Sequence, residues 1–184
     1  MAKLDKEQLS SLIGGISKIK LVSQTGTVTA TMFDDADEIY TVRDSVSIEQ
    51  SEPSKTEIKV DQMDSAIAAF YEPGDFTITG QIPSMAKDVL DYFFETNSTA
   101  ASAITGYGAG TGLEVSSKKV KATMLIESAD KQMAVAFMNV EFVARFSWSS
   151  TSTSLMNISF TATVLANPDG DDMVIFPAAT GVGA

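Results

Sequence analysis

Long stretches in which every second residue is apolar dominate the second half of the chain. Residues 136–146 and 156–164 both show this alternation, and small polar residues fill the other positions of the second stretch. Side chains of a strand point alternately to the two faces of a sheet, so a period of two predicts strands with one buried face. Both stretches exceed the five or six residues of an average strand, which predicts strands that project beyond a compact sheet. The expected buried face of the first stretch consists of Ala136, Met138, Val140, Phe142, Ala144 and Phe146.

Shorter alternating runs occupy most of the remaining chain and predict further strands. In residues 55–61, Ile58 and Val60 are expected to face the core, whereas Glu57, Lys59 and Asp61 are expected to face water. The full set of shorter runs covers residues 16–22, 27–33, 37–42, 45–50, 55–61, 76–79, 119–127 and 173–176. We therefore predict a mainly β fold, a sandwich or barrel of antiparallel strands.

One stretch, at about 84–95, has the spacing of an amphipathic helix. Pro83 ends the preceding strand, Ser84 is the expected N-cap, and Asn97 is suited to end the helix. The apolar stripe of this helix consists of Met85, Val89, Leu90, Phe93 and Phe94. We expect this one flanking α-helix to cover a face of the sandwich.

The order of the segments predicts a single domain with arms. We expect an N-terminal arm or short helix over 1–14, one β-sandwich domain over 15–176, and a flexible C-terminal tail over 177–184. Within the domain, a glycine-rich stretch predicts a mobile loop at about 97–116.

The glycines of this loop recur at every second residue. A dinucleotide-binding fingerprint needs a wider third spacing and a helix after the glycines, but here a strand follows. The glycines are instead candidates for a loop that contacts another subunit. They are Gly106, Gly108, Gly110 and Gly112.

Composition argues against most kinds of catalysis. The chain has no cysteine and no histidine, so thiol chemistry, the commonest general base and the commonest metal ligand are all missing. We expect no enzyme activity, no catalytic residues, no metal and no cofactor. The net charge of −11 argues against sequence-reading of nucleic acid. No apolar run reaches the length of a membrane span, and the first 15 residues do not resemble a signal peptide.

Three other features admit rival functions. The acidic turns at 33–38 and 167–172 carry clustered carboxylates, which calcium prefers, although the full calcium-loop pattern is missing. The serine- and threonine-rich stretch 146–154 surrounds Trp148, the one tryptophan, and fits either a long hairpin tip or a carbohydrate-binding patch. A carbohydrate-binding or adhesion module is therefore the alternative function, and a metal-assisted hydrolase is a third.

The layout over residues 15–176 resembles the major tail tube proteins of long-tailed bacteriophages, within the wider superfamily of injection-system tube proteins. The segment EPGDFTITGQIPSMAKDVLDYFF, residues 72–94, carries most of the resemblance, because this family commonly runs a strand of this kind into a helix. The arms, the long hairpin strands and the glycine-rich loop complete the likeness.

The resemblance implies a structural subunit of the virion tail that is assembled in the host cytoplasm. Rings of six subunits would stack into a hollow tube that conducts DNA during ejection without binding its sequence. The implied partners are further copies of the chain, together with tail terminator, tape measure and baseplate proteins. Neighbouring subunits would pair the exposed strand edges, which otherwise promote aggregation.

The acidic composition suits such a channel, because a wall of carboxylates repels phosphate groups. Between Asp34 and Asp64 the chain has ten acidic and three basic residues. We expect Glu49, Glu57 and Asp61, which lie on the outward faces of their strands, to be candidate lumen-facing acids.

Overall fold

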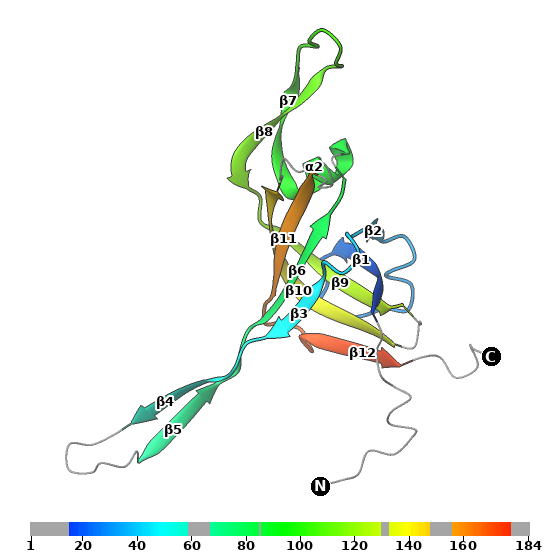
Figure 1. Cartoon of the computed structure of the whole chain (residues 1–184). Helices are drawn as coiled ribbons and strands as arrows, with labels where there is room; N and C mark the ends of the chain where they lie inside the picture. The colour runs from blue at the N-terminus through cyan, green and yellow to red at the C-terminus, as the bar shows by residue number, and fades with distance from the viewer. Residues whose placement is uncertain (1–14, 59–66, 85, 130–132, 148–155, 178–184) are drawn as a thin grey trace.

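The computed structural model describes residues 15–58, 67–84, 86–129, 133–147 and 156–177. Within these ranges the chain is mainly antiparallel β-sheet with a single helix, which confirms the predicted fold class (Figure 1). The strands are β1 (Ile16–Ser23), β2 (Asp37–Ile39), β3 (Ser47–Gln50), β4 (Ser54–Ile58), β5 (Ala68–Glu72), β6 (Phe76–Ile82), β7 (Phe94–Ala101), β8 (Gly110–Ser117), β9 (Val120–Ser128), β10 (Met133–Ser147), β11 (Asn157–Val164) and β12 (Met173–Pro177). The helix is α2 (Lys87–Phe93).

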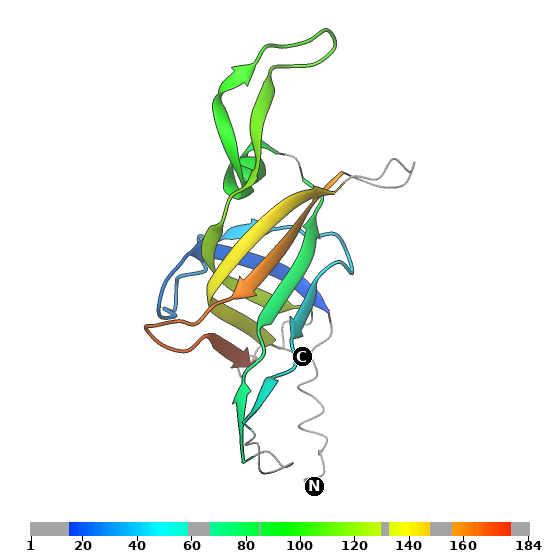
Figure 2. The ribbon, with the colours of Figure 1, turned by 90° about the vertical axis from the view of Figure 1, so that its left-hand side faces the viewer.

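One eight-stranded sheet forms the body of the molecule. Its strands follow the order β2-β1-β9-β10-β11-β6-β3, and β12 also pairs with β10. The long strand β10 pairs with β9 and β12 through its first half and with β11 through its second half. β10 therefore belongs to two layers, which cross each other in Figure 2, and one bent sheet forms both layers of the sandwich.

The bend in β10 lies at Met138 and Asn139. The register between β10 and β9 shifts between Phe137 and Val140, which marks a β-bulge. Thr123, fully buried on β9, donates a hydrogen bond from its hydroxyl to the Met138 carbonyl at 2.7 Å. The Asn139 side chain donates to the Ala166 carbonyl at 2.8 Å. The Thr123 bond satisfies the Met138 carbonyl, and two backbone bonds, from the Met138 amide to the Asp172 carbonyl and from the Leu165 amide to the Asn139 carbonyl, satisfy other groups that the bulge takes out of the ladder.

The bulge corrects the predicted buried face of this strand. Val140, Phe142 and Ala144 lie in the main core as expected, but Ala136 and Met138 lie in a second, smaller cluster with Leu125. Because an extra residue moves the alternation to the opposite face, Phe137 enters the main core instead. Phe146, the last residue of the expected face, is 40% exposed.

A loop before β2 covers the second cluster. Val28 and Phe33 pack against Leu125, Ala136 and Met138. Residues 27–33 form turns and irregular backbone, so the predicted strand there is wrong. Val28 and Phe33 thus cover the outer face of β9 and β10 rather than extend the sheet.

The helix is shorter than predicted. It spans Lys87–Phe93, and its N-cap is Ala86, which makes no side-chain capping bond. Ser84 does not cap the helix; its hydroxyl accepts a hydrogen bond from the Ala86 amide at 3.3 Å. Asn97 does not end it, because β7 already begins at Phe94, whose ring stacks on Phe146 with ring centres 4.4 Å apart.

The helix closes one end of the sandwich rather than standing free on its surface. Leu90 and Phe93 are buried in the main core, and the Phe93 ring lies 6.1 Å from that of Phe142 on β10. The β7–β8 hairpin leaves the body at this end (Figure 1).

Two hairpins project from the body in opposite directions, and we call them the β4–β5 arm and the β7–β8 arm (Figures 1 and 2). β4 pairs only with β5, and β7 pairs only with β8. The predicted mobile loop at about 97–116 is therefore wrong for most of its length, because residues 97–101 and 110–116 lie in paired strands. Ile58 does not face a core: it lies on the β4–β5 arm and is 45% exposed. Val60, Lys59 and Asp61 lie outside the described residues.

Candidate assembly surfaces

The outer face of the β11–β6–β3 layer is lined with hydroxyl groups. The register places Thr161 opposite Thr79 and Thr163 opposite Thr77. The inward residues between them, such as Ile78 and Ala162, are fully buried in the main core. We call this outer surface the hydroxyl face; it faces the viewer in Figure 2, and no described element covers it there. It consists of Ser47, Thr77, Thr79, Ser159, Thr161 and Thr163.

The three candidate lumen acids do not come together on this face. Glu49 lies opposite Thr77, so it belongs to the hydroxyl face, and it accepts a hydrogen bond from Ser47 at 2.9 Å. Glu57 lies on the β4–β5 arm, where it forms an ion pair with Lys55 at 2.5 Å. Asp61 lies outside the described residues. Sequence alternation assigns a face within one strand, but it does not show that the strand leaves the body.

Among the described residues, β2, β3 and β12 each pair with a single strand of the body, β1, β6 and β10 respectively, and β3 and β12 also expose apolar side chains at these edges. Ile48 lies opposite the fully buried Ile78 and yet is 38% exposed. Ile175 lies opposite Val135 in the β10–β12 pair. Val135 packs against the main core, whereas Ile175 is 52% exposed. The core is thus left uncovered along these edges, where a further strand or a neighbouring molecule would bury it.

The β4–β5 arm carries exposed apolar side chains, and its two strands pair with no strand of the described body. Ile58 pairs with Ala68, and Thr56 pairs with Phe70, so Ile58 and Phe70 share one face of the hairpin. Phe70 is 58% exposed, and Tyr71 on the other face is 66% exposed. A lone two-stranded hairpin is marginally stable in water, so this arm is suited to packing against another surface.

The tip of the β7–β8 arm is a tight turn with an apolar residue on each side. The Tyr107 amide donates to the Ile104 carbonyl at 2.9 Å, and Gly106 at the third position has a φ of 88°, as a type II turn requires. Ile104 and Tyr107 are both largely exposed.

The structure divides the four candidate contact glycines between this tip and β8. Gly106 and Gly108 lie in the tip, and nothing lies within 4 Å of a side chain built at either position. Gly110 and Gly112 lie in β8. A side chain at Gly112 would come within 3.2 Å of the Asn97 side chain on β7. The two strand glycines therefore belong to the pairing of the arm, and the two tip glycines to its exposed end.

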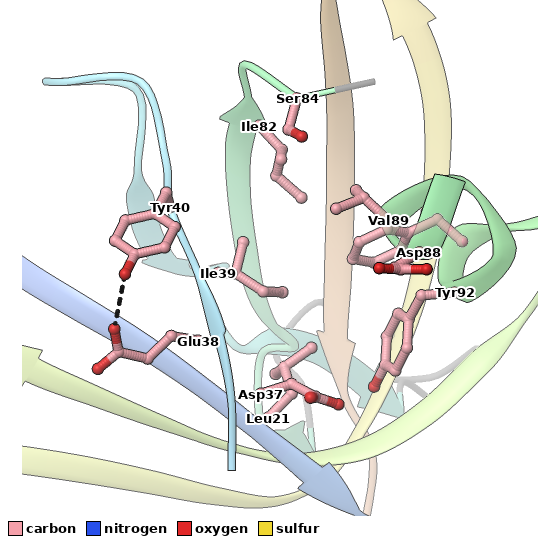
Figure 3. Close-up of a pocket in the computed structure, with 11 residues that line it drawn as sticks. Leu21, Asp37, Glu38, Ile39, Tyr40, Ile82, Ser84, Asp88, Val89 and Tyr92 are labelled. Carbon is pink, nitrogen blue, oxygen red and sulfur yellow. Dashed lines mark hydrogen bonds between the residues drawn. The ribbon is translucent and has the colours of Figure 1, made fainter. Parts of the chain in front are cut away.

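A cavity of about 310 Å³ lies between β2, the end of β6 and the helix (Figure 3). Apolar side chains, among them Leu21, Ile39 and Val89, line its interior. Its polar lining includes Asp37, Glu38, Tyr40, Ser84, Asp88 and Tyr92. No sequence pattern links these residues, because β2 and the helix are separated by about 50 positions and meet only in the folded chain.

The acids around this cavity differ in their partners. Glu38 accepts hydrogen bonds from Lys18 at 2.5 Å and from Tyr40 at 3.2 Å, and the Lys18 bond in particular lowers the pKa of Glu38. Asp37 and Asp88 form no ion pair with any residue that the structure describes. Burial, and secondarily the nearby Asp37 carboxylate, raise the pKa of Tyr92. The cavity thus combines an apolar interior with two carboxylates that have no cation partner among the described residues.

The acidic turn at 167–172 is held by hydrogen bonds within the protein. The Asn167 side chain is buried and donates to the carbonyls of Gly26 and Asp171, both at 3.0 Å. The Asn167 amide donates to an Asp172 carboxylate oxygen at 2.6 Å. Nowhere in the described ranges do three acidic side chains gather in a way that would hold a metal ion.

Two other features of the sequence add no site. Trp148 and most of the serine- and threonine-rich stretch lie outside the described residues, so the carbohydrate-binding alternative gains no geometry. Among the described helical residues, none belongs to a helix long and apolar enough to cross a membrane.

Comparison with known proteins adds no relative. No protein-family model matches the chain, and no curated protein matches it significantly.

Proposed function

We propose that this protein is a self-assembling structural subunit, and specifically the tail tube subunit of a long-tailed bacteriophage or related particle. Six copies form a ring, and rings stack into a hollow tube that conducts DNA. Further partners are the baseplate, tape measure and tail terminator proteins of the particle. The proposal rests on the resemblance in layout and on one structural observation: the fold leaves apolar groups exposed along two strand edges and on two arms.

The edges support closure of the sheet between subunits. An unpaired edge with exposed apolar residues favours association, and a ring of identical head-to-tail contacts between the β3 and β12 edges pairs both of them in every subunit. In this arrangement the β3 edge of one subunit meets the β12 edge of the next, so that Ile48 and Ile175 become buried.

The hydroxyl face supports the role of channel wall. It is polar, no described element covers it, and Glu49 adds negative charge to it. In the proposed ring this face points to the lumen, where carboxylates repel the DNA backbone. Of the two expected lumen acids that the structure describes, Glu49 supports that role by its place on the hydroxyl face, while Asp61 lies outside the described residues. Glu57 is assigned instead to the arm.

Negative-stain microscopy of the concentrated protein tests the proposal directly. We expect rings or hollow rods. The variant Ile48→Lys/Ile175→Lys, which places charges on both exposed edges, should remain folded by circular dichroism but should not assemble. The matched control Thr79→Lys/Thr161→Lys places the same charges on the hydroxyl face and should still form rings. A protein that stays monomeric at every concentration would refute the proposal.

A further inference from the structure

Asp37 is an acid at a position where the register of the sheet predicts an apolar residue. On β2 it lies directly opposite Leu21 of β1, which is buried in the main core. Residues paired directly across two strands share one face, so the Asp37 side chain leaves the strand on the inner face of the sheet. Ile39, the next residue on the same face of β2, packs against the main core as this position requires. Asp37 therefore departs from the pattern that its own strand follows.

No cation among the described residues neutralises Asp37. The two lysines of the neighbouring strand β1, Lys18 and Lys20, both form ion pairs with glutamates. The hydroxyl of Tyr92 points toward Asp37 in Figure 3. Burial raises the pKa of Tyr92 above its ordinary value, so this phenol is uncharged at neutral pH and leaves the negative charge of Asp37 unmet.

The cavity beside Asp37 has the size and the walls of a small-molecule site. Its volume of about 310 Å³ lies at the lower end of the range of ligand pockets, roughly 300–1,000 Å³. Leu21, Ile82 and Phe93, which line its interior, are all buried in the main core. The packing of the core therefore holds these walls in place.

This combination selects a cation with an apolar body. Apolar walls favour a hydrocarbon group over water, and a carboxylate beside such walls attracts a cation more strongly than a carboxylate in bulk water does. An anion would be repelled, and a neutral apolar molecule would leave Asp37 without a partner. Asp88 adds a second carboxylate to the lining, although its place in the first turn of the helix suits an acid even without a ligand.

We propose that this cavity binds a small organic ammonium ion, with the apolar body of the ligand in the interior and its charge at Asp37. Asp88 adds a second, weaker attraction. The lining includes neither Ile48 nor Ile175 and no residue of the two arms. The inference therefore goes beyond self-assembly and does not depend on it.

Saturation-transfer difference NMR on the full chain tests this site, because the method observes the small ligand whether the protein is a monomer or an assembly. The probe is phenethylamine, which joins an ammonium group to an aromatic body. We expect a dissociation constant on the order of 1 mM, as suits a ligand of so few atoms. Phenethyl alcohol lacks the charge and ethanolamine lacks the apolar body, so each should bind at least about fivefold more weakly.

Two variants that each remove one negative charge locate the ligand in the cavity. Asp37→Asn keeps the shape of the side chain and should weaken phenethylamine binding about fivefold, whereas Asp88→Asn should weaken it about twofold. Both aspartates are exposed, so both variants should keep the circular dichroism spectrum of the natural chain. The matched control Glu49→Gln removes the same charge from the hydroxyl face and should leave the affinity nearly unchanged.

Several results would overturn the proposed site. They are an absence of phenethylamine binding to the natural chain and undiminished binding to Asp37→Asn. Equal binding of ethanolamine would also overturn it, since general attraction to an acidic protein would then account for the signal. Equal binding of phenethyl alcohol would do the same by showing that the cavity does not select an ammonium group. Microscopy of assembly is a separate measurement, so these results leave the proposed function standing.

Discussion

At the scale of single residues, a glycine makes room for a core aromatic ring on the neighbouring strand. Gly80 on β6 lies opposite Phe160 on β11, and a side chain built on Gly80 would come within 2.7 Å of the Phe160 ring. The ring is buried in the main core and contacts Phe142 at 5.8 Å between ring centres. Phe160 therefore occupies the space that any other residue at position 80 would need.

We expect Gly80→Ala to destabilise the protein by about 1–3 kcal/mol, because the added methyl group displaces a packed ring. Urea unfolding followed by circular dichroism measures the change. Gly108→Ala is the matched control: nothing lies within 4 Å of the added group, so the unfolding midpoint should change little. Equal midpoints for the two variants would show that the ring can move freely.

At the scale of elements, the β4–β5 arm continues the β3–β6 hairpin beyond the body. The two parts join where the Ser51 amide donates to the Asp75 carbonyl at 3.0 Å and the Asp75 amide donates to the Ser51 hydroxyl at 2.9 Å. Gly74 permits this close approach, since a side chain there would lie 1.7 Å from the Ser51 carbonyl oxygen. The arm is thus joined to the body by a defined junction but is not packed against it.

Removing the arm should therefore separate folding from assembly. Replacement of residues 54–72 by an Asn-Gly turn, which suits a two-residue hairpin, should change the free energy of unfolding by less than about 1 kcal/mol, because β4 and β5 pair only with each other. The same variant should lose rods in negative stain. Normal rods from the shortened chain would show that the arm has no part in assembly.

At the scale of the whole molecule, net charge opposes association. Each chain carries −11, so neighbouring copies repel one another at low ionic strength. The contacts proposed between subunits are largely apolar, and salt screens the repulsion without weakening such contacts.

Assembly should consequently increase with salt. We expect the fraction of polymer in sedimentation velocity to rise as sodium chloride increases from 20 to 500 mM, on the scale over which the Debye length falls from about 20 Å to about 4 Å. Monomeric maltose-binding protein, measured alongside, should show no change. A polymer fraction that falls with salt would mean that ion pairs, rather than apolar contacts, dominate the joints.

Several features of the fold could be predicted from the sequence because they depend on local periodicity. The alternation of residues 156–164 predicted β11, and the spacing around Leu90 and Phe93 predicted a core-facing helix. Side-chain direction in one strand or helix is a local property, so it can be read from neighbouring residues. The apolar run at 173–176 likewise predicted β12.

Other features depended on contacts between distant segments. The bulge at Met138 and Asn139 moved half of β10 to the opposite face, and its stabilising bonds come from Thr123 and Ala166. The cavity unites β2 with the helix, and the junction at Gly74 depends on Ser51. The sequence by itself determined which residues alternate and which class of fold they build. Only the tertiary structure decided where the sheet bends, which hairpins leave the body and which acids meet, because each of these depends on atoms that folding brings together from far apart in the chain.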